Sequence, residues 1–431
     1  MLSVAEAEAR ILALCVPFSG GDREEIPITE GRSRILAKAV LAARDVPHWD
    51  NSAMDGFAVR SRDCQESGAE LKVIDEVPAG ENPGEALQAG QAARIFTGGV
   101  LPRGADAVVM QEETEVEDSA VAKSVVIKTA VKSGQFVRRR GDYCRAGASI
   151  LAAGTRLGPA ELAIAAANQT AQLSVLRRPK VAILSTGNEL VSVDQPLQPG
   201  QIVDSNRYAL IAFVEQMGAI PMPLGIVGDR REDVTAAIRQ AISEADVVLS
   251  TGGVSVGDYD YVEAVLEELG GAIAVRKVAV KPGKPLTVAQ FSAGKLRHLG
   301  LDSQGRDRPV VYFGLPGNPV SALVGCWRFV APALRTISGR SPDGIAPQFV
   351  MATTRSTLRG AGTRDNYLWG RLGLDTESDQ GGFSFQGATG HHNSANLINL
   401  AGTTGLAIVP AGTKTIQAGE SVQVMLIQEL G

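Results

Sequence analysis

The stretch VVLSTGGVSVGDYDY, residues 247–261, joins an all-apolar run to a polar loop that is rich in glycine. An apolar run this short is typical of a strand that is buried on both faces of a sheet. After the loop, Val262, Val265, Leu266 and Leu269 recur at helical spacing. A buried strand, a polar loop and an amphipathic helix, in that order, form the repeating unit of a parallel α/β sheet.

The same unit recurs on both sides of this stretch. Further buried strands are predicted at residues 181–184, 224–227 and 310–313. Further helices are predicted at residues 206–217 and 234–242 and from Val320 onward, where Pro319 suits the first helical position. We therefore predict that residues 179–332 form a central three-layer α/β/α domain with a mainly parallel sheet and helices on both faces.

The regions that flank this domain have a different pattern. Short apolar runs broken by Gly, Pro and Asp predict mainly β structure. We expect an elongated N-terminal or linker domain (1–45 and 145–178), a small β-rich domain (46–144) and a C-terminal β-domain (333–431). The first residues carry acids among apolar residues and lack a basic region, which favours an amphipathic helix over a signal peptide.

Length and composition exclude several classes of protein. A chain of 431 residues is too long for one core, and its net charge of −5 argues against a general nucleic-acid binder. The four cysteines lie far apart without a C-x-x-C pair, which argues against a thiolate metal site and a disulfide framework. No uninterrupted apolar run reaches the length of a membrane span. We expect a cytoplasmic protein that binds neither nucleic acid nor a membrane.

Three loops follow strands of the central domain at the edge where open α/β sheets bind ligands. Glycines let backbone N–H groups approach an anion, and hydroxyls add neutral donors. The polar residues and glycines of these loops are Ser185, Thr186, Asn188 and Glu189; Thr251, Gly252, Gly253, Ser255, Asp258 and Asp260; and Gly317, Asn318 and Ser321. Carboxylates at Glu189 and Asp260 would suit a Mg²⁺ ion shared with substrate phosphates. Lys281 and Lys284, in VKPGKP, could hold an oxyanion or a phosphoryl group.

Each of these motifs alone has an ordinary structural interpretation. TGNE and PGNP are common turn sequences, Asp260 could cap the helix that carries Val262, and the two lysines could be solvated turn residues. Their combination at equivalent strand ends of one domain predicts an anion site, whose reaction this argument leaves undefined.

The β-rich half has its own candidate, residues 46–60, where Asp50, Asn51, Ser52 and Asp55 stand close together. A turn that enters the following strand explains these residues equally well. Thr97 lies in a second glycine turn, and Asp142 follows a run of three arginines that could be salt-bridged or could meet a phosphate.

Taken in order, nine segments resemble the molybdopterin molybdenumtransferase family, which includes the E domains of gephyrin and its plant relatives. They lie between about residue 46 and residue 324 and read DNSAMDGFA, RIFTGG, GADAVV, RRRGD, STGNEL, DSN, TGGVSVGDYDY, KPGKP and GLPGNPVS. Any one of them is a weak signal, whereas nine in the right order are a strong one.

The resemblance implies an elongated homodimer with four domains per subunit. Its site is expected between the central domain of one subunit and the small β-domain of the other. The implied reaction inserts molybdate into adenylylated molybdopterin with Mg²⁺-assisted cleavage of the pyrophosphate link, which releases AMP and molybdenum cofactor. By motif, Glu189 and Asp260 look like metal or nucleotide-site acids, and Asp229 in IVGDR looks like a functional acid. The remaining carried-over residues are Asp55, Thr97 and Asp142 from the β-domain, and Lys281, Lys284 and Ser321 as substrate contacts.

The C-terminal region departs from the family pattern. Arg364 is present, but Trp369 stands where the pattern has a second basic residue. In the loop TGHHNSANL, Ser394 matches while His392 replaces the usual glutamine. The resemblance implies molybdate contacts by Arg364 and Ser394, and we interpret His391 and His392 as polar loop residues.

Two other functions compete with this one. The central domain alone resembles the sibling adenylyltransferase that activates molybdopterin with ATP, but that sibling is a short single-domain protein. The other alternative is a non-enzymatic scaffold, by analogy with the receptor clustering of gephyrin. The sequence shows neither a fused partner domain nor a long linker that would support this role.

Overall fold

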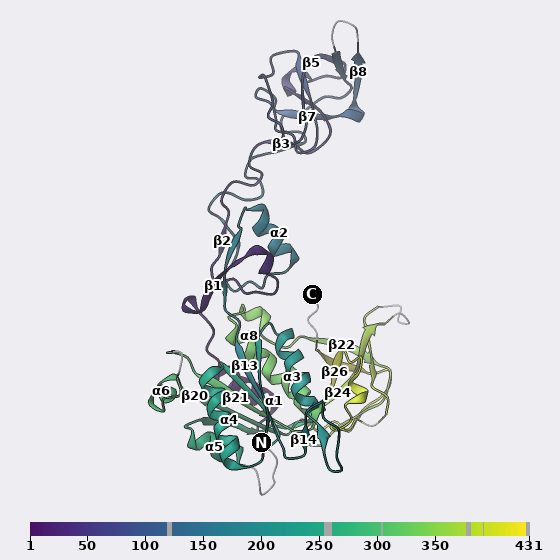
Figure 1. Ribbon diagram of the computed structural model, residues 1–431. Helices are drawn as coiled ribbons and strands as arrows, with labels where there is room; N and C mark the ends of the chain where they lie inside the picture. The colour runs from purple at the N-terminus through teal and green to yellow at the C-terminus, as the bar shows by residue number, and fades with distance from the viewer. Residues whose placement is uncertain (119–122, 254–260, 303–304, 376–380, 391, 428–431) are drawn as a thin grey trace.

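The chain forms an elongated molecule, with a small β-domain at one end, a narrow linker domain, and a broad body at the other end (Figure 1). The body consists of the central α/β domain and the C-terminal β-domain. This computed structural model describes residues 1–431 except 119–122, 254–260, 303–304, 376–380, 391 and 428–431.

The central domain is built on a six-stranded sheet of order β16-β13-β17-β21-β20-β18. Its strands are β13 (Lys180–Thr186), β16 (Ile220–Val227), β17 (Val247–Thr251), β18 (Ala272–Lys277), β20 (Pro285–Phe291) and β21 (Val310–Leu315). Strands β13, β16, β17 and β21 are parallel, as the apolar runs predicted. Strand β20 runs antiparallel to β21, and β18 runs antiparallel to β20. The mainly parallel sheet is confirmed, but the antiparallel pair β18–β20 was not predicted.

Both faces of the sheet are buried because alternate side chains enter two separate cores. Val181 and Ile183 point into one core with Val247 and Leu249, while their neighbours Ala182 and Leu184 point into the other. The first core is covered by α3 (Ser205–Gln216), α7 (Pro319–Gly325) and α8 (Ala331–Ile337). The second is covered by α4 (Arg231–Glu244), α5 (Val262–Glu268) and α6 (Ala293–His298).

The N-terminal helix α1 (Val4–Leu14) also packs in the first core of the central domain. Val4, Ala7 and Ile11 face that core, Ser3 caps the helix, and Leu2 bridges to Val278. The predicted amphipathic helix is present, but it lies outside the linker domain to which residues 1–45 were assigned. Helical periodicity identifies an apolar face without identifying the partner that covers it.

A buried ion pair fastens α1 to the body. The Arg328 guanidinium donates to both Glu8 carboxylate oxygens at 2.6 and 2.8 Å and to the Tyr367 hydroxyl at 3.1 Å, and its side chain is 7% exposed. Glu8→Ala would leave a buried guanidinium without its carboxylate, so we expect the free energy of unfolding to fall by about 3 kcal/mol. Urea unfolding measures this loss.

The double variant Glu8→Leu with Arg328→Met serves as the control because it removes both charges and keeps apolar bulk. It is expected to lose much less stability than Glu8→Ala alone. Equal losses in the two proteins would contradict the assignment of a costly unpaired charge.

The chain leaves the body after Phe18 and returns at Arg177, so the linker domain and the small β-domain form one long excursion (Figure 1). In the linker, β1 (Arg23–Pro27) pairs with β12 (Gln172–Leu176), β2 (Val40–Leu41) pairs with β11 (Ser149–Leu151), and α2 (Pro159–Ala167) packs beside them.

The small β-domain is a six-stranded sheet of order β7-β4-β6-β5-β9-β8 with a core on each face. Its strands are β4 (Gly56–Val59), β5 (Ala69–Val77), β6 (Gln91–Ile95), β7 (Ala107–Met110), β8 (Thr114–Asp118) and β9 (Lys123–Ile127), with the short pair β3 (Asn51–Ser52) and β10 (Val137–Arg138) at its base.

The C-terminal domain is a closed β-barrel, because β24 pairs with both β25 and β26. Its strands are β22 (Phe349–Thr354), β24 (Asp365–Leu374), β25 (Phe383–Gly387), β26 (Gly405–Val409) and β28 (Ser421–Leu426), with the short pair β23 (Leu358–Arg359) and β27 (Thr415–Ile416). The short strand β19 (Val280–Lys281) of the central domain pairs in parallel with β24. This pairing joins the barrel to the α/β domain.

The helical run Pro319–Ile337 is long and apolar enough, by length and composition, to cross a membrane, although the sequence showed no apolar run of that length. Of this run, 78% is buried inside the protein, where α7 and α8 pack on the central sheet. It is a core helix of the body.

Candidate functional site

A large cavity, of about 1800 Å³, lies between the carboxyl edge of the central sheet and the C-terminal barrel. The pairing of β19 with β24 sets Lys281 opposite Asn366 and so brings the two walls together. The sequence-predicted residues that line it are Thr186, Glu189, Gly252, Gly253, Lys281, Lys284, Asn318, Ser321, Arg364 and Ser394. One cavity therefore collects most of the predicted substrate contacts.

The first wall consists of the strand-end loops of the α/β domain. Thr186 ends β13, and Gly252 and Gly253 follow β17. Gly252 has a φ of +88°, and a Cβ there would stand 2.4 Å from the Thr186 carbonyl oxygen, so only glycine fits. Because Gly252 has no side chain, the backbone at this strand end remains accessible to a ligand.

The second wall is the turn that carries the predicted lysine pair. Lys281 and Lys284 flank Pro282 and Gly283, and both lysine side chains are exposed at the cavity. Gly283 adopts a φ of +103°, which gives the tight reversal between β19 and β20. The two ammonium groups thus enter the cavity from one short turn.

The third wall comes from the barrel. Arg359 and Arg364 bring two guanidinium groups, and the Asn318 side-chain amide donates to the Ser394 hydroxyl at 3.2 Å across the two domains. The Asn366 amide donates to the Arg359 carbonyl at 2.7 Å. The first contact links the barrel loop of Ser394 to a strand-end loop of the central domain, and the second lies within the barrel.

Trp369 and His392, the two departures from the family pattern, pack against each other at the base of this wall. Their ring centroids are 4.5 Å apart in an edge contact, and the Trp369 indole N–H donates to the Asn399 side-chain oxygen at 3.0 Å. Trp369 is only 1% exposed. Burial lowers the pKa of His392, which favours a neutral imidazole. The indole is therefore a packing residue of the barrel rather than a replacement for a cationic contact.

The described lining of the cavity is positively charged. Among its described lining residues, Lys281, Lys284, Arg359 and Arg364 face a single carboxylate, that of Glu189. Four cations around one acid suit a ligand that carries several negative charges.

The described residues contain no group of three His, Cys, Asp or Glu side chains that could hold a metal ion. Mg²⁺ needs no such cage, because it is commonly held by one or two carboxylates together with substrate phosphates and water. Glu189, exposed at the cavity, fits that role, whereas the second predicted ligand, Asp260, lies outside the described residues, as do Ser255 and Asp258.

Two predicted residues of the central domain, Ser185 and Asp229, are not among the described residues that line the cavity. Ser185 is fully buried and receives a hydrogen bond from the Thr251 hydroxyl at 3.3 Å. The Asp229 carboxylate accepts from the Asn188 N–H at 3.0 Å, and the Asn188 side chain accepts from the Asp229 N–H at 3.2 Å. Asp229 therefore holds the loop that carries Glu189, and its role as a functional acid stays a prediction.

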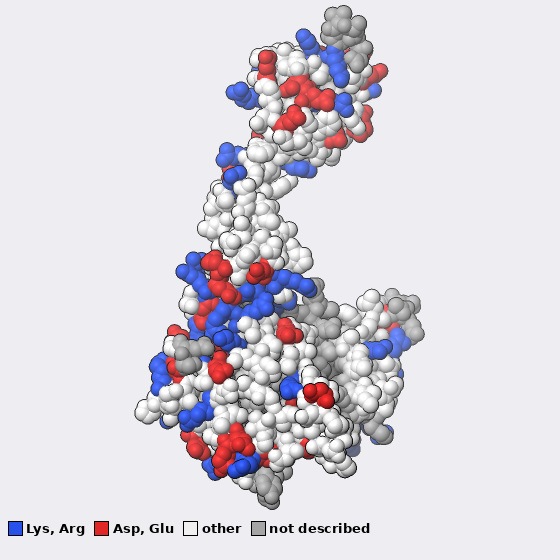
Figure 2. Space-filling model, in the orientation of Figure 1, with Lys and Arg blue, Asp and Glu red and all other residues white. Residues whose placement is uncertain are grey.

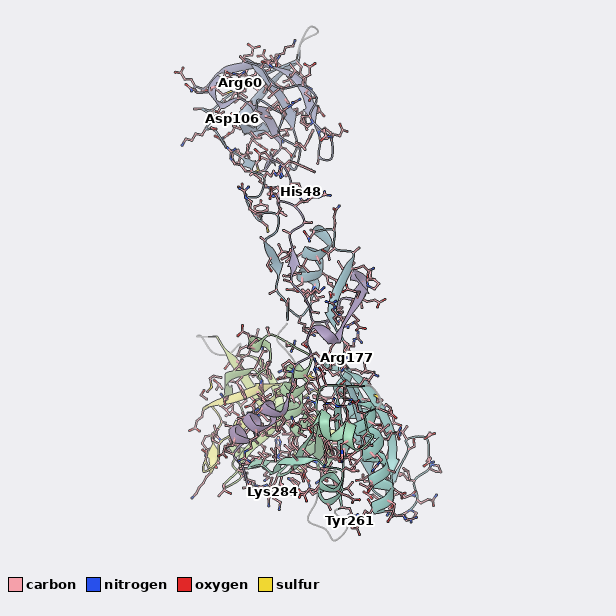
Figure 3. All side chains as sticks on the ribbon, turned by 90° about the vertical axis from the view of Figure 1, so that its left-hand side faces the viewer. His48, Arg60, Asp106, Arg177, Tyr261 and Lys284 are labelled. Atoms are coloured by element: carbon pink, nitrogen blue, oxygen red, sulfur yellow. The ribbon has the colours of Figure 1, made fainter. Side chains whose placement is uncertain are left out.

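Asp55, Thr97 and Asp142 lie in the small β-domain, at the opposite end of the molecule from the cavity (Figure 1). Figure 3 shows the same separation between the β-domain residue Asp106 and Lys284 at the cavity. The Asp55 carboxylate accepts from the Thr97 N–H and hydroxyl, both at 2.7 Å, and these bonds lower the pKa of Asp55. Asp142 accepts from the Arg139 N–H at 2.8 Å. Within one chain these three residues do not join the cavity.

Sequence reasoning missed several polar residues of the cavity, including Asn206, Arg359, Asn366 and Asn393. Asn206 donates to the Gly317 carbonyl at 2.7 Å and so supports the third strand-end loop. DSN, the motif that contains Asn206, was one of the nine segments and was the available signal. Arg359 and Asn366 belong to no local motif, and they reach the cavity because the barrel packs on the central domain.

An anion cavity at the glycine-lined strand ends of an α/β domain, closed by a β-barrel, defines a multidomain enzyme of the α/β class with a charged ligand site. Three family models match consecutive parts of the chain: "MoeA N-terminal region (domain I and II)" over residues 2–168, "Probable molybdopterin binding domain" over 182–336, and "MoeA C-terminal region (domain IV)" over 351–427.

Curated relatives match over nearly the whole chain. The molybdopterin molybdenumtransferase of Nostoc sp. is 48% identical over 94% of this chain and 88% of its own length, and that of Bacillus subtilis is 33% identical over 99% and 94%. A crystal structure of a molybdopterin biosynthesis MoeA protein from Pyrococcus horikoshii is 30% identical over the full length of both chains, with a TM-score of 0.76. The chain belongs to the molybdopterin molybdenumtransferase family, and is a transferase of molybdenum cofactor biosynthesis. The predicted family, enzyme class and multidomain α/β and β fold are confirmed.

Proposed function

We propose that this enzyme inserts molybdate into adenylylated molybdopterin, cleaves the pyrophosphate link with the help of Mg²⁺, and releases AMP and molybdenum cofactor. The observation that carries the proposal is the single cavity in which four cations and one carboxylate meet glycine-lined strand ends. Adenylylated molybdopterin and molybdate are both anions, and together they match that charge.

Two bond changes make up the proposed reaction. Water attacks one phosphorus of the pyrophosphate link, so that AMP leaves, the pterin keeps a terminal phosphate, and two protons are released. The two dithiol sulfurs replace one oxygen of molybdate, which departs as water with both thiol protons, and molybdenum stays in its hexavalent state. Lys281 and Lys284 would hold the charge of the phosphoryl group or the oxyanion, and Arg364 and Ser394 would orient molybdate from the barrel side.

Mg²⁺ would neutralise the pyrophosphate oxygens and polarise the phosphorus for attack. Glu189 is the described residue that would hold it, and Asp229 keeps the Glu189 loop in place through Asn188. The strand-end glycines would admit the phosphate oxygens to backbone N–H groups.

We further propose that the enzyme acts as a homodimer in the cytoplasm. Asp55 and Thr97 are joined by hydrogen bonds in a turn that bears the Asp55 charge. This turn lies in the small β-domain, which is remote from the cavity of the same chain (Figure 1). A second subunit, placed antiparallel, would bring its β-domain to this cavity and complete the site.

The first test is AMP release from adenylylated molybdopterin by the purified enzyme. We expect AMP to form only when molybdate and Mg²⁺ are both present, with EDTA reducing the rate to background and added Mg²⁺ restoring it. Chromatographic quantification of AMP measures the rate.

AMP release that is independent of both additions would contradict the proposal. Consumption of ATP with molybdopterin, in place of AMP release, would favour the adenylyltransferase alternative. A protein without either activity that binds a stable protein ligand would favour the scaffold.

A further inference from the structure

A buried arginine joins three separate parts of the molecule. Charged side chains gather on the surface where the linker meets the body (Figure 2), whereas the Arg328 side chain lies inside the body and is only 7% exposed. Its guanidinium pairs with Glu8 of α1, and its Nε donates to the hydroxyl of Tyr367 in β24 at 3.1 Å. Arg328 itself belongs to the core helix Pro319–Ile337. One side chain therefore holds the N-terminal helix, the core helix and the barrel together.

The core helix departs from α-helical geometry at Arg328. Residues Cys326–Val330 form a π-helical turn, and the Ala331 N–H donates to the carbonyl of Cys326, five residues earlier. Such turns inside α-helices are rare and are frequent at functional sites. The same helix starts at the cavity, where Ser321 in its first turn is a lining residue. The unusual turn thus lies in a helix that forms part of the site.

Strand β24 connects the Arg328 contact to the cavity. Tyr367 is 2% exposed and packs in the first core of the central domain, while its neighbours Asn366 and Leu368 line the cavity. The Asn366 amide donates to the Arg359 carbonyl at 2.7 Å, and Asn366 stands opposite Lys281 where β24 pairs with β19. A shift of Tyr367 would therefore move the strand that brings the barrel wall to the lysine turn.

The N-terminal segment reaches the same place by a second route. The Leu2 N–H donates to the Lys277 carbonyl at 3.0 Å, and the Ala279 N–H donates to the Leu2 carbonyl at 2.8 Å. The Ala279 carbonyl accepts from the N–H of Asp365, the first residue of β24, at 3.0 Å. The segment before the lysine turn therefore lies between Leu2 and β24. Because α1 follows Leu2, the helix that Arg328 holds is tied to both walls of the cavity.

We propose that Arg328 is a positioning residue of the cavity: by joining Tyr367 to the core helix and to α1, it sets the distance between the barrel wall and the lysine turn. Arg364 and Lys281, one from each wall, would have to converge on one oxyanion, and a displacement of about 1 Å is enough to weaken such a site strongly. A guanidinium suits this task because its rigid fork holds several partners in a fixed geometry. The inference rests on the proposed function for the identity of the oxyanion, molybdate.

Tyr367→Phe tests the inference, because it removes the hydroxyl that accepts from Arg328 and keeps the buried ring. We expect the Kd for molybdate, measured by isothermal titration of the full-length protein, to rise about tenfold, since Arg364 and Ser394 would contact molybdate from the barrel. The Kd for AMP should stay within about twofold, since the strand-end loops that would bind AMP belong to the central domain. A residue that only stabilised the fold would leave both affinities unchanged or weaken both.

Tyr312→Phe is the matched control. Tyr312 is fully buried in the second core, and its hydroxyl donates to the Ser250 hydroxyl at 2.5 Å, so this variant loses the same kind of contact. It should bind molybdate and AMP normally. Arg328→Lys keeps a cation for Glu8 but loses the Nε donor, so it should weaken molybdate binding as Tyr367→Phe does. If the two residues act through one contact, the double variant should be no weaker than either single variant.

An unchanged Kd for molybdate in Tyr367→Phe, an equal loss of AMP binding, or an equal loss of molybdate binding in Tyr312→Phe would overturn the inference. Circular dichroism verifies that each variant is folded, and Tyr367→Phe decides the matter if Arg328→Lys does not fold. Absence of molybdate binding by the unchanged protein would contradict the proposed function instead. Hydrogen exchange then decides the positioning role: the Asp365 amide should exchange faster in Tyr367→Phe than in Tyr312→Phe, and equal rates would overturn it.

Discussion

Asp55→Ala is expected to reduce AMP release roughly 100-fold or more while the body of the protein stays folded. Asp55 is exposed on a turn of the small β-domain, and hydrogen bonds from the N–H and the hydroxyl of Thr97 lower the pKa of Asp55. The carboxylate is therefore ionised at neutral pH and, in the proposed homodimer, would act on a ligand held by the other subunit. Turnover is measured as AMP formation.

Two further variants separate charge from structure. Asp55→Asn keeps an oxygen that accepts from Thr97 but removes the charge, so we expect it to be as inactive as Asp55→Ala. Asp106 accepts from the N–H and hydroxyl of Ser61, both at 2.7 Å, in the same domain. Asp106→Ala loses the same kind of turn contact and should retain turnover. Retained activity in both Asp55 variants would contradict the proposed role of Asp55 in turnover.

The same variants test whether the site is shared between subunits. Asp55→Ala and Lys281→Ala protomers, each inactive alone, are co-expressed with different tags, and heterodimers are isolated with both tags. One of the two sites in each heterodimer is then intact, so about half of the normal activity should return. A heterodimer as inactive as its parents would place Asp55 and Lys281 in the same protomer's site or remove Asp55 from it.

Trp369→Ala is expected to have the largest effect on stability, a loss of roughly 3–5 kcal/mol. The indole is 1% exposed, packs edge-on against His392, and donates to Asn399. Its removal would leave a cavity beneath the loop that carries Ser394. Hydrogen exchange of the β24 and β26 amides measures the loss where it arises.

Trp369→Phe is the matched control, because it keeps an aromatic ring and removes the indole N–H. We expect it to lose about 1 kcal/mol from the hydrogen bond, plus a smaller packing loss. Molybdate affinity should fall in Trp369→Ala, through disorder of the barrel wall, and change little in Trp369→Phe. Equal protection of the β24 amides in all three proteins would show that the position is not a packing residue.

The central domain was the most predictable part of the fold. Residues 181–184 and 247–249 are fully apolar because both faces of their strands are covered, and this pattern is local. The pair β18–β20 was missed although Leu286, Val288 and Ala289 are buried in β20. In the chain, β18 and β20 lie between α5 and β21, where they interrupt the alternation of strand and helix on which the predicted parallel sheet rested.

The site was predictable where its residues follow strands and unpredictable where distant segments meet. Glu189 and Gly252 follow buried strands, so the topology of a parallel sheet was enough to bring them together. Arg359 reaches the cavity because the barrel packs on the central domain, in part through the pairing of β19 with β24, and no periodicity in the sequence specifies that pairing. For the same reason, the sequence did not predict that α1 belongs to the body.

The position of α1 has a consequence for the order of synthesis. The ion pair of Glu8 with Arg328 joins residues 320 positions apart, and the whole arm is translated between them. The apolar face of α1 therefore leaves the ribosome long before the strands that cover it in the folded protein. It stays uncovered while the linker and the β-domain are synthesised. The nascent chain would present this helix to chaperones, and the body can close only near the end of translation.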